Sequence, residues 1–228
     1  MRLSNSLFRL DRFAVIFYFC LWLPLGATTV AISNLDQTPT SNVAVGKQSG
    51  FNFQEAGSFT TGGTAYSLDS ISLDIVLASV SASDFTLSLY TGMSTAGPTG
   101  LVATLVGSSH PTVGINEYDA DAAIMLLSSS TYWIVASAPD TAVGTGFGVR
   151  STTSTSEDAG GLADWTIGDT RWLTNNGGTT WSQGASGALL EFSVNVTSSS
   201  VPDGGMTSVL FGIALVGLFV LRRKFASA

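Results

Sequence analysis

The chain has 228 residues, of which nine are basic and 16 acidic, so its formal net charge is −7. Residues 28–205 hold three basic and 15 acidic residues, a net charge of −12. A surface this acidic argues against binding to nucleic acid or to anionic lipid headgroups, both of which need lysine and arginine. The single cysteine is Cys20, so disulfides and thiolate chemistry are excluded from everything that follows it.

The first 27 residues have the layout of a secretory signal peptide. Three arginines within the first 12 residues precede an apolar run of 13 residues that ends at Leu25. Small residues follow, and they predict cleavage after Ala27, with cleavage after Ala31 as the alternative. The partners implied are the Sec machinery and signal peptidase. An uncleaved N-terminal membrane helix is the competing interpretation.

Residues 28–50 are polar and contain a proline and two glycines, so they predict an N-terminal arm with room for one edge strand. From 51 to 196 apolar residues alternate with polar ones, which is typical of strands that face a core on one side. Residues 114–120 lack this alternation and are expected to be irregular. The predicted strands are Glu55–Thr61, Ser67–Leu77, Phe85–Leu89, Leu101–Leu105, Ala123–Leu127, Thr131–Ala138, Phe147–Arg150, Arg171–Thr174, Thr179–Gln183 and Ala188–Val196.

This pattern contains no amphipathic helix and has turn residues between short strands, which favours an antiparallel β-sandwich. The fold class predicted is therefore all-β with a jelly-roll-like topology over residues 51–196. An N-terminal signal helix precedes the sandwich, and one C-terminal transmembrane helix follows it.

The C-terminal region has three parts in a fixed order. Residues 197–205 form a spacer and the motif Val201-Pro202-Asp203-Gly204-Gly205, residues 206–221 are uncharged, and residues 222–228 begin with Arg222-Arg223-Lys224. A helix of 16 residues covers roughly 24 Å, slightly less than a hydrocarbon core. The basic cluster acts as a membrane stop on the cytoplasmic side, so the body lies outside the inner membrane.

This order of motif, apolar helix and basic cluster resembles the PEP-CTERM sorting signals of Gram-negative bacteria, in a variant that begins Val-Pro-Asp. The resemblance implies recognition and cleavage by an exosortase, with the motif residues 201–205 as recognition positions. The protein is then an inner-membrane intermediate that ends at the cell surface or in the extracellular matrix. A permanently tail-anchored protein is the alternative.

The body resembles the bacterial surface modules called choice-of-anchor domains, in particular the R-type. The resemblance rests on Asn34–Thr38, Ala56–Gly62 and Tyr66–Ile71 and spans roughly residues 33–196. It supports a surface location and implies no molecular activity.

Glu117, Asp119 and Asp121 alternate along the chain, so an extended segment projects them to one side. Carboxylates with this spacing supply oxygen ligands to Ca²⁺, which makes calcium the one cofactor considered. The alternative is a solvated acidic loop.

Trp165, Trp172 and Trp181 lie among glycines and polar residues near the end of the body. If exposed, their rings are suited to stacking on sugars, and a surface polysaccharide is then a partner. The alternative is packing in a hairpin and in the core. A carbohydrate-binding module is accordingly the main rival function.

His110 is the sole histidine, and no nucleophile or base motif accompanies it. A hydrolase built on His110 or on a pair of carboxylates is therefore a weaker rival. We expect a non-enzymatic exported protein with no catalytic residue.

Overall fold

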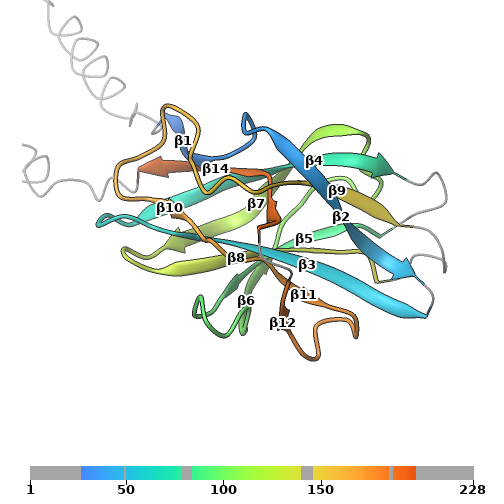
Figure 1. Cartoon of the computed structure of the whole chain (residues 1–228). Helices are drawn as coiled ribbons and strands as arrows, with labels where there is room; N and C mark the ends of the chain where they lie inside the picture. The colour runs from blue at the N-terminus through green and yellow to red at the C-terminus, as the bar shows by residue number, and fades with distance from the viewer. Residues whose placement is uncertain (1–26, 49, 79–83, 140–145, 185–186, 199–228) are drawn as a thin grey trace, which may run out of the picture.

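The computed structural model describes residues 27–48, 50–78, 84–139, 146–184 and 187–198, which form β-strands and no helix (Figure 1). Accordingly, no helix within these ranges is long and apolar enough to cross a membrane. The expected signal helix and transmembrane helix lie outside the described residues. The all-β prediction is confirmed for the described body.

Strands of two to 13 residues follow one another along the chain. They are β1 (Thr28–Ser33), β2 (Pro39–Gln48), β3 (Phe51–Thr60), β4 (Tyr66–Ala78), β5 (Thr86–Thr91), β6 (Gly100–Thr104), β7 (Gly114–Leu126), β8 (Thr131–Ser137), β9 (Phe147–Thr152), β10 (Thr166–Ile167), β11 (Trp172–Thr174), β12 (Ser182–Gln183), β13 (Leu189–Leu190) and β14 (Phe192–Ser198).

The strands form one antiparallel sheet that curls on itself, in the order β1-β14-β4-β9-β2-β3-β8-β5-β6. Strand β7 pairs with β4, while the short strands β10 and β11 pair with β3. The β2–β3 hairpin lies in the middle of this order and joins the strands on one side of the curl, through β9, to those on the other, through β8. In Figure 1, β4 and β14 therefore lie in one layer, and β3, β8 and β5 lie in the layer that faces it.

The core lies between the two layers. Ile71, Leu73 and Ile75 of β4 are fully buried, which confirms the period-two pattern predicted for this strand. The ring of Phe59 from β3 lies 6.3 Å from the ring of Phe192 from β14, so the layers meet directly. Burying each large apolar side chain contributes about 1.5–3 kcal/mol, so this contact is a main source of stability.

The N-terminal arm predicted for residues 28–50 is wrong. This segment contains two strands, β1 and β2, and Ala31, Ile32 and Val45 are fully buried in the core. Strand β1 pairs with β14, while β2 crosses from β9 to β3. The prediction failed because β1 and β2 each have only a few side chains that point into the core, and the residues around them are polar and face outward.

The irregular segment predicted for residues 114–120 is also wrong. It belongs to β7, which pairs along β4 from Ile75↔Gly114 to Tyr66↔Leu126. A register shift in β4 between Leu68 and Ser70 breaks the alternation of the pair. Tyr118, Ile124 and Leu126 are buried at even positions, but Ile115 and Met125 are exposed at odd positions, so the apolar residues of β7 do not alternate with polar ones.

Candidate functional site

The chain enters and leaves the body at neighbouring positions. Thr28, the first residue of β1, stands opposite Thr197 in the ladder between β1 and β14. Figure 1 shows the start of β1 and the end of β14 at the same end of the molecule. The segments before and after the body are therefore attached side by side.

A single carboxylate holds these two strand ends together. Oδ2 of Asp69 accepts a hydrogen bond from Thr28 Oγ1 at 2.8 Å and another from Thr197 Oγ1 at 2.5 Å. Asp69 lies in β4 between Leu68, which pairs with Val196, and Ser70, which pairs with Asn195, so it is an extra residue in the ladder between β4 and β14. We call Thr28, Asp69 and Thr197 the terminal clasp.

The predicted sorting motif, residues 201–205, and the basic cluster, residues 222–224, lie outside the described residues. The last described residue is Ser198, which pairs with Tyr66. In the sequence, two residues, 199 and 200, separate Ser198 from the first residue of the motif.

The three predicted calcium ligands all lie on β7 and are exposed. Glu117 is already engaged, because its Oε1 accepts a hydrogen bond from Ser70 Oγ at 2.5 Å. Asn195 Nδ2 donates in turn to Ser70 Oγ at 2.9 Å, so a polar ladder crosses β7, β4 and β14. Within the described ranges, no group of three or more histidine, cysteine or acidic residues is placed to hold a metal ion. Calcium binding by Glu117, Asp119 and Asp121 stays a prediction.

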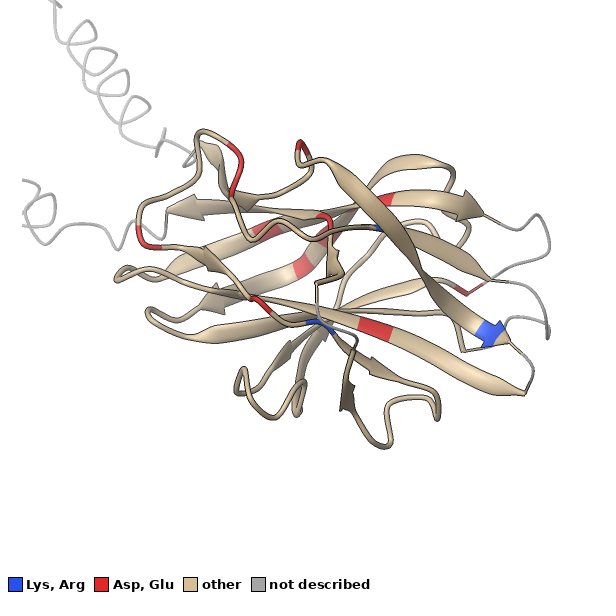
Figure 2. Cartoon of the chain, viewed as in Figure 1, with Lys and Arg blue, Asp and Glu red and all other residues tan. Residues whose placement is uncertain are grey.

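The acidic excess is a property of the whole body rather than of one site. Figure 2 shows acidic residues on many strands and loops and few basic ones. Two arginines each pair with a mostly buried carboxylate: Arg150 with Asp74 at 2.8 Å and Arg171 with Glu55 at 3.5 Å. An acidic outer surface of this kind repels anionic ligands.

Trp165 does not fit the predicted sugar-stacking role. It is 2% exposed, and its ring stacks on Phe59 at 5.7 Å with an interplanar angle of 7°. Tyr66 contacts the same ring edge-on. Trp165 is therefore a core residue. It directly precedes β10, which pairs with β3, so this segment lies against the layer formed by β3, β8 and β5.

Trp172 and Trp181 lie elsewhere, away from the main core. Both are partly exposed and pack against Ala56, Trp133 and Val135. The structure thus brings two of the three predicted tryptophans together and separates the third. It adds Trp133, which the sequence pattern placed inside a strand with no indication of its face.

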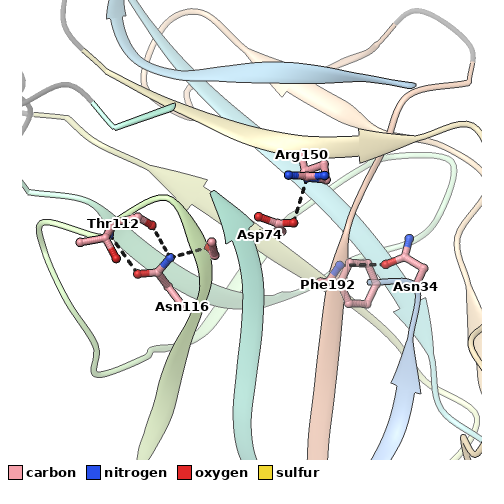
Figure 3. A network of polar contacts seen from close by, with 7 residues as sticks. Asn34, Asp74, Thr112, Asn116, Arg150 and Phe192 are labelled. Atoms are coloured by element: carbon pink, nitrogen blue, oxygen red, sulfur yellow. Dashed lines mark hydrogen bonds and ion pairs between the residues drawn. The ribbon is translucent and has the colours of Figure 1, made fainter. Parts of the chain in front are cut away.

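His110 lies on the loop between β6 and β7 and is exposed. Its Nδ1 contacts the hydroxyl of Ser109 at 2.9 Å. The same loop is closed by Asn116, whose side chain bonds the backbone of Thr112 and Gly114 (Figure 3). These contacts account for the local conformation of the loop.

A second polar centre lies on the outer face of the β4 layer (Figure 3). Arg150 Nε lies 2.8 Å from Asp74 Oδ2, and Glu191 lies beside them, fully buried. Neither carboxylate oxygen of Glu191 has a hydrogen-bond partner within the part of the chain that the structure describes. Burial raises the pKa of Glu191 to about 7, although the nearby Arg150 opposes this rise.

The side chain of Asn34 fixes the backbone on both sides of Glu191. Glu191 interrupts the strand between β13 and β14, where the chain changes partner from β9 to β4. Asn34 Oδ1 accepts from Phe192 N at 2.8 Å, and Asn34 Nδ2 donates to Leu190 O at 3.0 Å. The buried amide of Asn34 thus satisfies the backbone groups on both sides of the break.

Comparison with known proteins bears on the C-terminal region. Residues 200–225 match the family model of the VPDSG-CTERM motif. This is a PEP-CTERM-like sorting signal, and it implies that the protein is exported and sorted through an exosortase. Gly204 stands where the name of the motif has serine. No curated protein matches the chain.

Proposed function

We propose that this protein is a non-enzymatic surface or extracellular-matrix protein of a Gram-negative bacterium. In this proposal a signal peptide directs it through the Sec machinery. Its tail then holds it in the inner membrane until an exosortase cleaves near the motif at residues 201–205. The observation that carries the proposal is the match of residues 200–225 to the sorting motif.

The arrangement of the body supports this order of events. Strands β1 and β14 are neighbours, so the N-terminal and C-terminal segments are joined to the body at adjacent strand ends. The short connection from Ser198 to the motif keeps the folded body next to the bilayer before cleavage. Cleavage at the motif removes no residue of β14.

The start of β1 favours one of the two predicted signal peptidase sites. Cleavage after Ala27 leaves Thr28 as the first residue and keeps β1 whole. Cleavage after Ala31 removes three residues that pair with β14 and one, Ala31, that is fully buried. We therefore propose that the bond between Ala27 and Thr28 is the one cleaved.

We also propose that the curled sheet has the jelly-roll topology and that the body is a choice-of-anchor module. The two facing layers support the first part. The structural use of Asn34, at the start of one of the segments that carry the resemblance, supports the second.

The experiment that tests the proposed function is intact mass spectrometry of the protein from fractionated cells. The chain is expressed in a host that has an exosortase for this motif and in the same host with that exosortase deleted. We expect loss of about 23 to 28 C-terminal residues in the first host and an intact C-terminus in the membrane fraction of the second. An intact C-terminus in both hosts contradicts the proposal and leaves a permanently tail-anchored protein.

A further inference from the structure

The outer face of the β3–β8–β5 layer carries a second apolar cluster. The strand register places Tyr90, Trp133 and Ser58 in one row across these strands, and Val135 and Ala56 in the next. Because side chains alternate between the two faces of a strand, both rows point away from the main core. We call Tyr90, Trp133, Trp172 and Trp181 the outer aromatic cluster.

The cluster is partly open to solvent. Strand β11 pairs with β3 so that Trp172 stands opposite Ala56, on the same outer face. The rings of Trp172 and Trp133 meet edge to face, with centroids 6.3 Å apart and an interplanar angle of 82°. Trp133 is fully buried, whereas Trp172 and Trp181 keep part of their surface exposed.

Two hydrogen-bond donors in this cluster have no acceptor among the described residues. Nε1 of Trp133 and Nε1 of Trp172 are both buried and unpartnered. A buried donor left unpaired costs about 1–3 kcal/mol, and buried indole N–H groups normally find a partner. Two such groups in contacting rings indicate a place where an oxygen-bearing ligand is accommodated.

The loop between β5 and β6, residues 92–99, covers this place. Gly97 lies on the ring of Trp172, where a Cβ would come within 2.8 Å of Cε3. Gly97 N donates to Met93 O within the loop, and Thr99 N donates to Thr91 O at the end of β5. The loop rests on Trp172 through van der Waals contact at Gly97.

The surroundings of the cluster are polar and almost uncharged. Between residues 170 and 184 the single charged residue is Arg171, which pairs with Glu55. Alternation places Arg171 on the face opposite Trp172. The exposed side chains beside the rings are amides and hydroxyls, from Asn176, Thr180, Ser182 and Gln183.

We propose that the outer aromatic cluster binds a neutral polysaccharide. Sugar rings stack on the exposed faces of Trp172 and Trp181, and sugar hydroxyl oxygens accept from the indole N–H of Trp172 once the 92–99 loop moves aside. Charge excludes the anionic alternatives, because residues 28–205 carry a net charge of −12. This proposal goes beyond the sorting function and does not depend on it.

The test is isothermal titration of the full chain, held in a detergent without a sugar headgroup. The probes are neutral gluco-, manno-, xylo- and galacto-oligosaccharides, with alginate oligosaccharide as the anionic comparator. We expect saturable binding of at least one neutral probe and none of alginate. Trp181→Ala is expected to weaken binding about tenfold or more, which corresponds to about 1.4 kcal/mol.

Trp181→Phe keeps an aromatic face and is expected to retain most of the affinity. Phe51→Ala removes an aromatic ring that is 50% exposed on β3, outside the cluster, and serves as the matched control. A thermal melt of each variant establishes that it is folded. Absence of binding to every neutral probe at millimolar concentration overturns the proposal, as does an affinity that Trp181→Ala leaves unchanged. Either result leaves the sorting proposal standing, because no exosortase takes part in this measurement.

Discussion

Thr28 and Thr197 face each other across the β1–β14 ladder and donate to the same oxygen, Asp69 Oδ2, at 2.8 and 2.5 Å. Because β1 is the first strand of the body and β14 the last, this clasp ties together the two points where the chain enters and leaves. The strand that leads to the sorting motif is therefore held in the sheet almost to its last residue.

Replacement of Asp69 by alanine tests the contribution of the terminal clasp. The variant loses an acceptor for two hydroxyl groups, and we expect the free energy of unfolding to fall by about 1–2 kcal/mol. Urea denaturation measures the change. Asp169→Ala is the control, because Asp169 bonds the neighbouring Thr170 in an exposed position. Equal losses in the two variants would remove any special role for Asp69.

The N-terminus of the exported protein is expected to be Thr28. Valine at the residue before the cleaved bond blocks signal peptidase, which requires a small side chain there. Ala27→Val is therefore expected to leave the precursor unprocessed, whereas Ala31→Val leaves the N-terminus at Thr28. N-terminal sequencing measures both. A mature chain that begins at Ile32 would mean that the paired residues of β1 are removed after export.

Strands with strong alternation were predictable from the sequence. The prediction of Ser67–Leu77 agrees with β4, whose apolar residues alternate because one face lies in the core. The prediction of Thr131–Ala138 agrees with β8, where a continuous apolar run reflects burial on both faces. Strand β1 and the first part of β7 were missed for a physical reason, whereas Ala123–Leu127 was predicted and overlaps the end of β7. Each of the two strands exposes many side chains, and β7 exposes apolar residues such as Ile115 and Met125, so hydrophobic period is a weak signal there.

The candidate sites show the same limit. The sorting signal was recognisable because its order of motif, apolar segment and basic cluster is local in sequence, and the family comparison matches it. The tryptophans could not be assigned, because Trp165 and Trp172 differ only in the face of β3 on which they pack. Strand pairing between residues far apart in the sequence determines that face, and a local sequence pattern does not reveal this pairing.

The sorting motif itself is tested by a double substitution, Pro202→Ala with Asp203→Ala. Proline forces its predecessor into an extended shape, which suits a peptide that enters a protease, and Asp203 is the charged residue of the motif. We expect full-length protein to accumulate in the inner membrane, as measured by fractionation and intact mass. Ser199→Ala, just outside the matched residues 200–225, is expected to be processed normally. Unchanged processing of the double variant would show that the motif is not recognised.

Gly97 is required for the fit of the 92–99 loop against Trp172. Its φ of +73° disfavours any residue with a Cβ, and that Cβ would also press against the indole ring. We expect Gly97→Ala to lower the free energy of unfolding by about 2–3 kcal/mol. Gly160→Ala has a similar backbone, with φ of +103°, and no atom within 4 Å of the added Cβ. Its expected loss of about 1 kcal/mol measures backbone strain alone. Equal losses in thermal melts of the two variants would mean that the contact with Trp172 is unimportant.

Two buried carboxylates make the stability of the body depend on pH. Burial raises the pKa of Glu55 to about 7, opposed by Arg171, and it raises the pKa of Glu191 to about 7 as well. Each group is neutral in the folded state below pH 7, whereas in the unfolded chain it ionises near 4.5. Below about pH 4.5 the two groups are neutral in both states and do not reduce the free energy of unfolding. As the pH rises from there through 7, that free energy falls by at most about 3 kcal/mol per group.

Glu191→Gln isolates one of these contributions, because glutamine stays neutral and has nearly the same shape. At about pH 5 we expect little change in the free energy of unfolding, whereas at about pH 8 the variant is expected to be more stable than the parent by about 1 kcal/mol or more. Urea denaturation at both pH values measures this difference. The parent protein, measured at the same two pH values, is the reference. If Glu191→Gln follows the parent's profile, then Glu191 is ionised in the folded protein at neutral pH, and its charge is stabilised by Arg150 more strongly than burial opposes it.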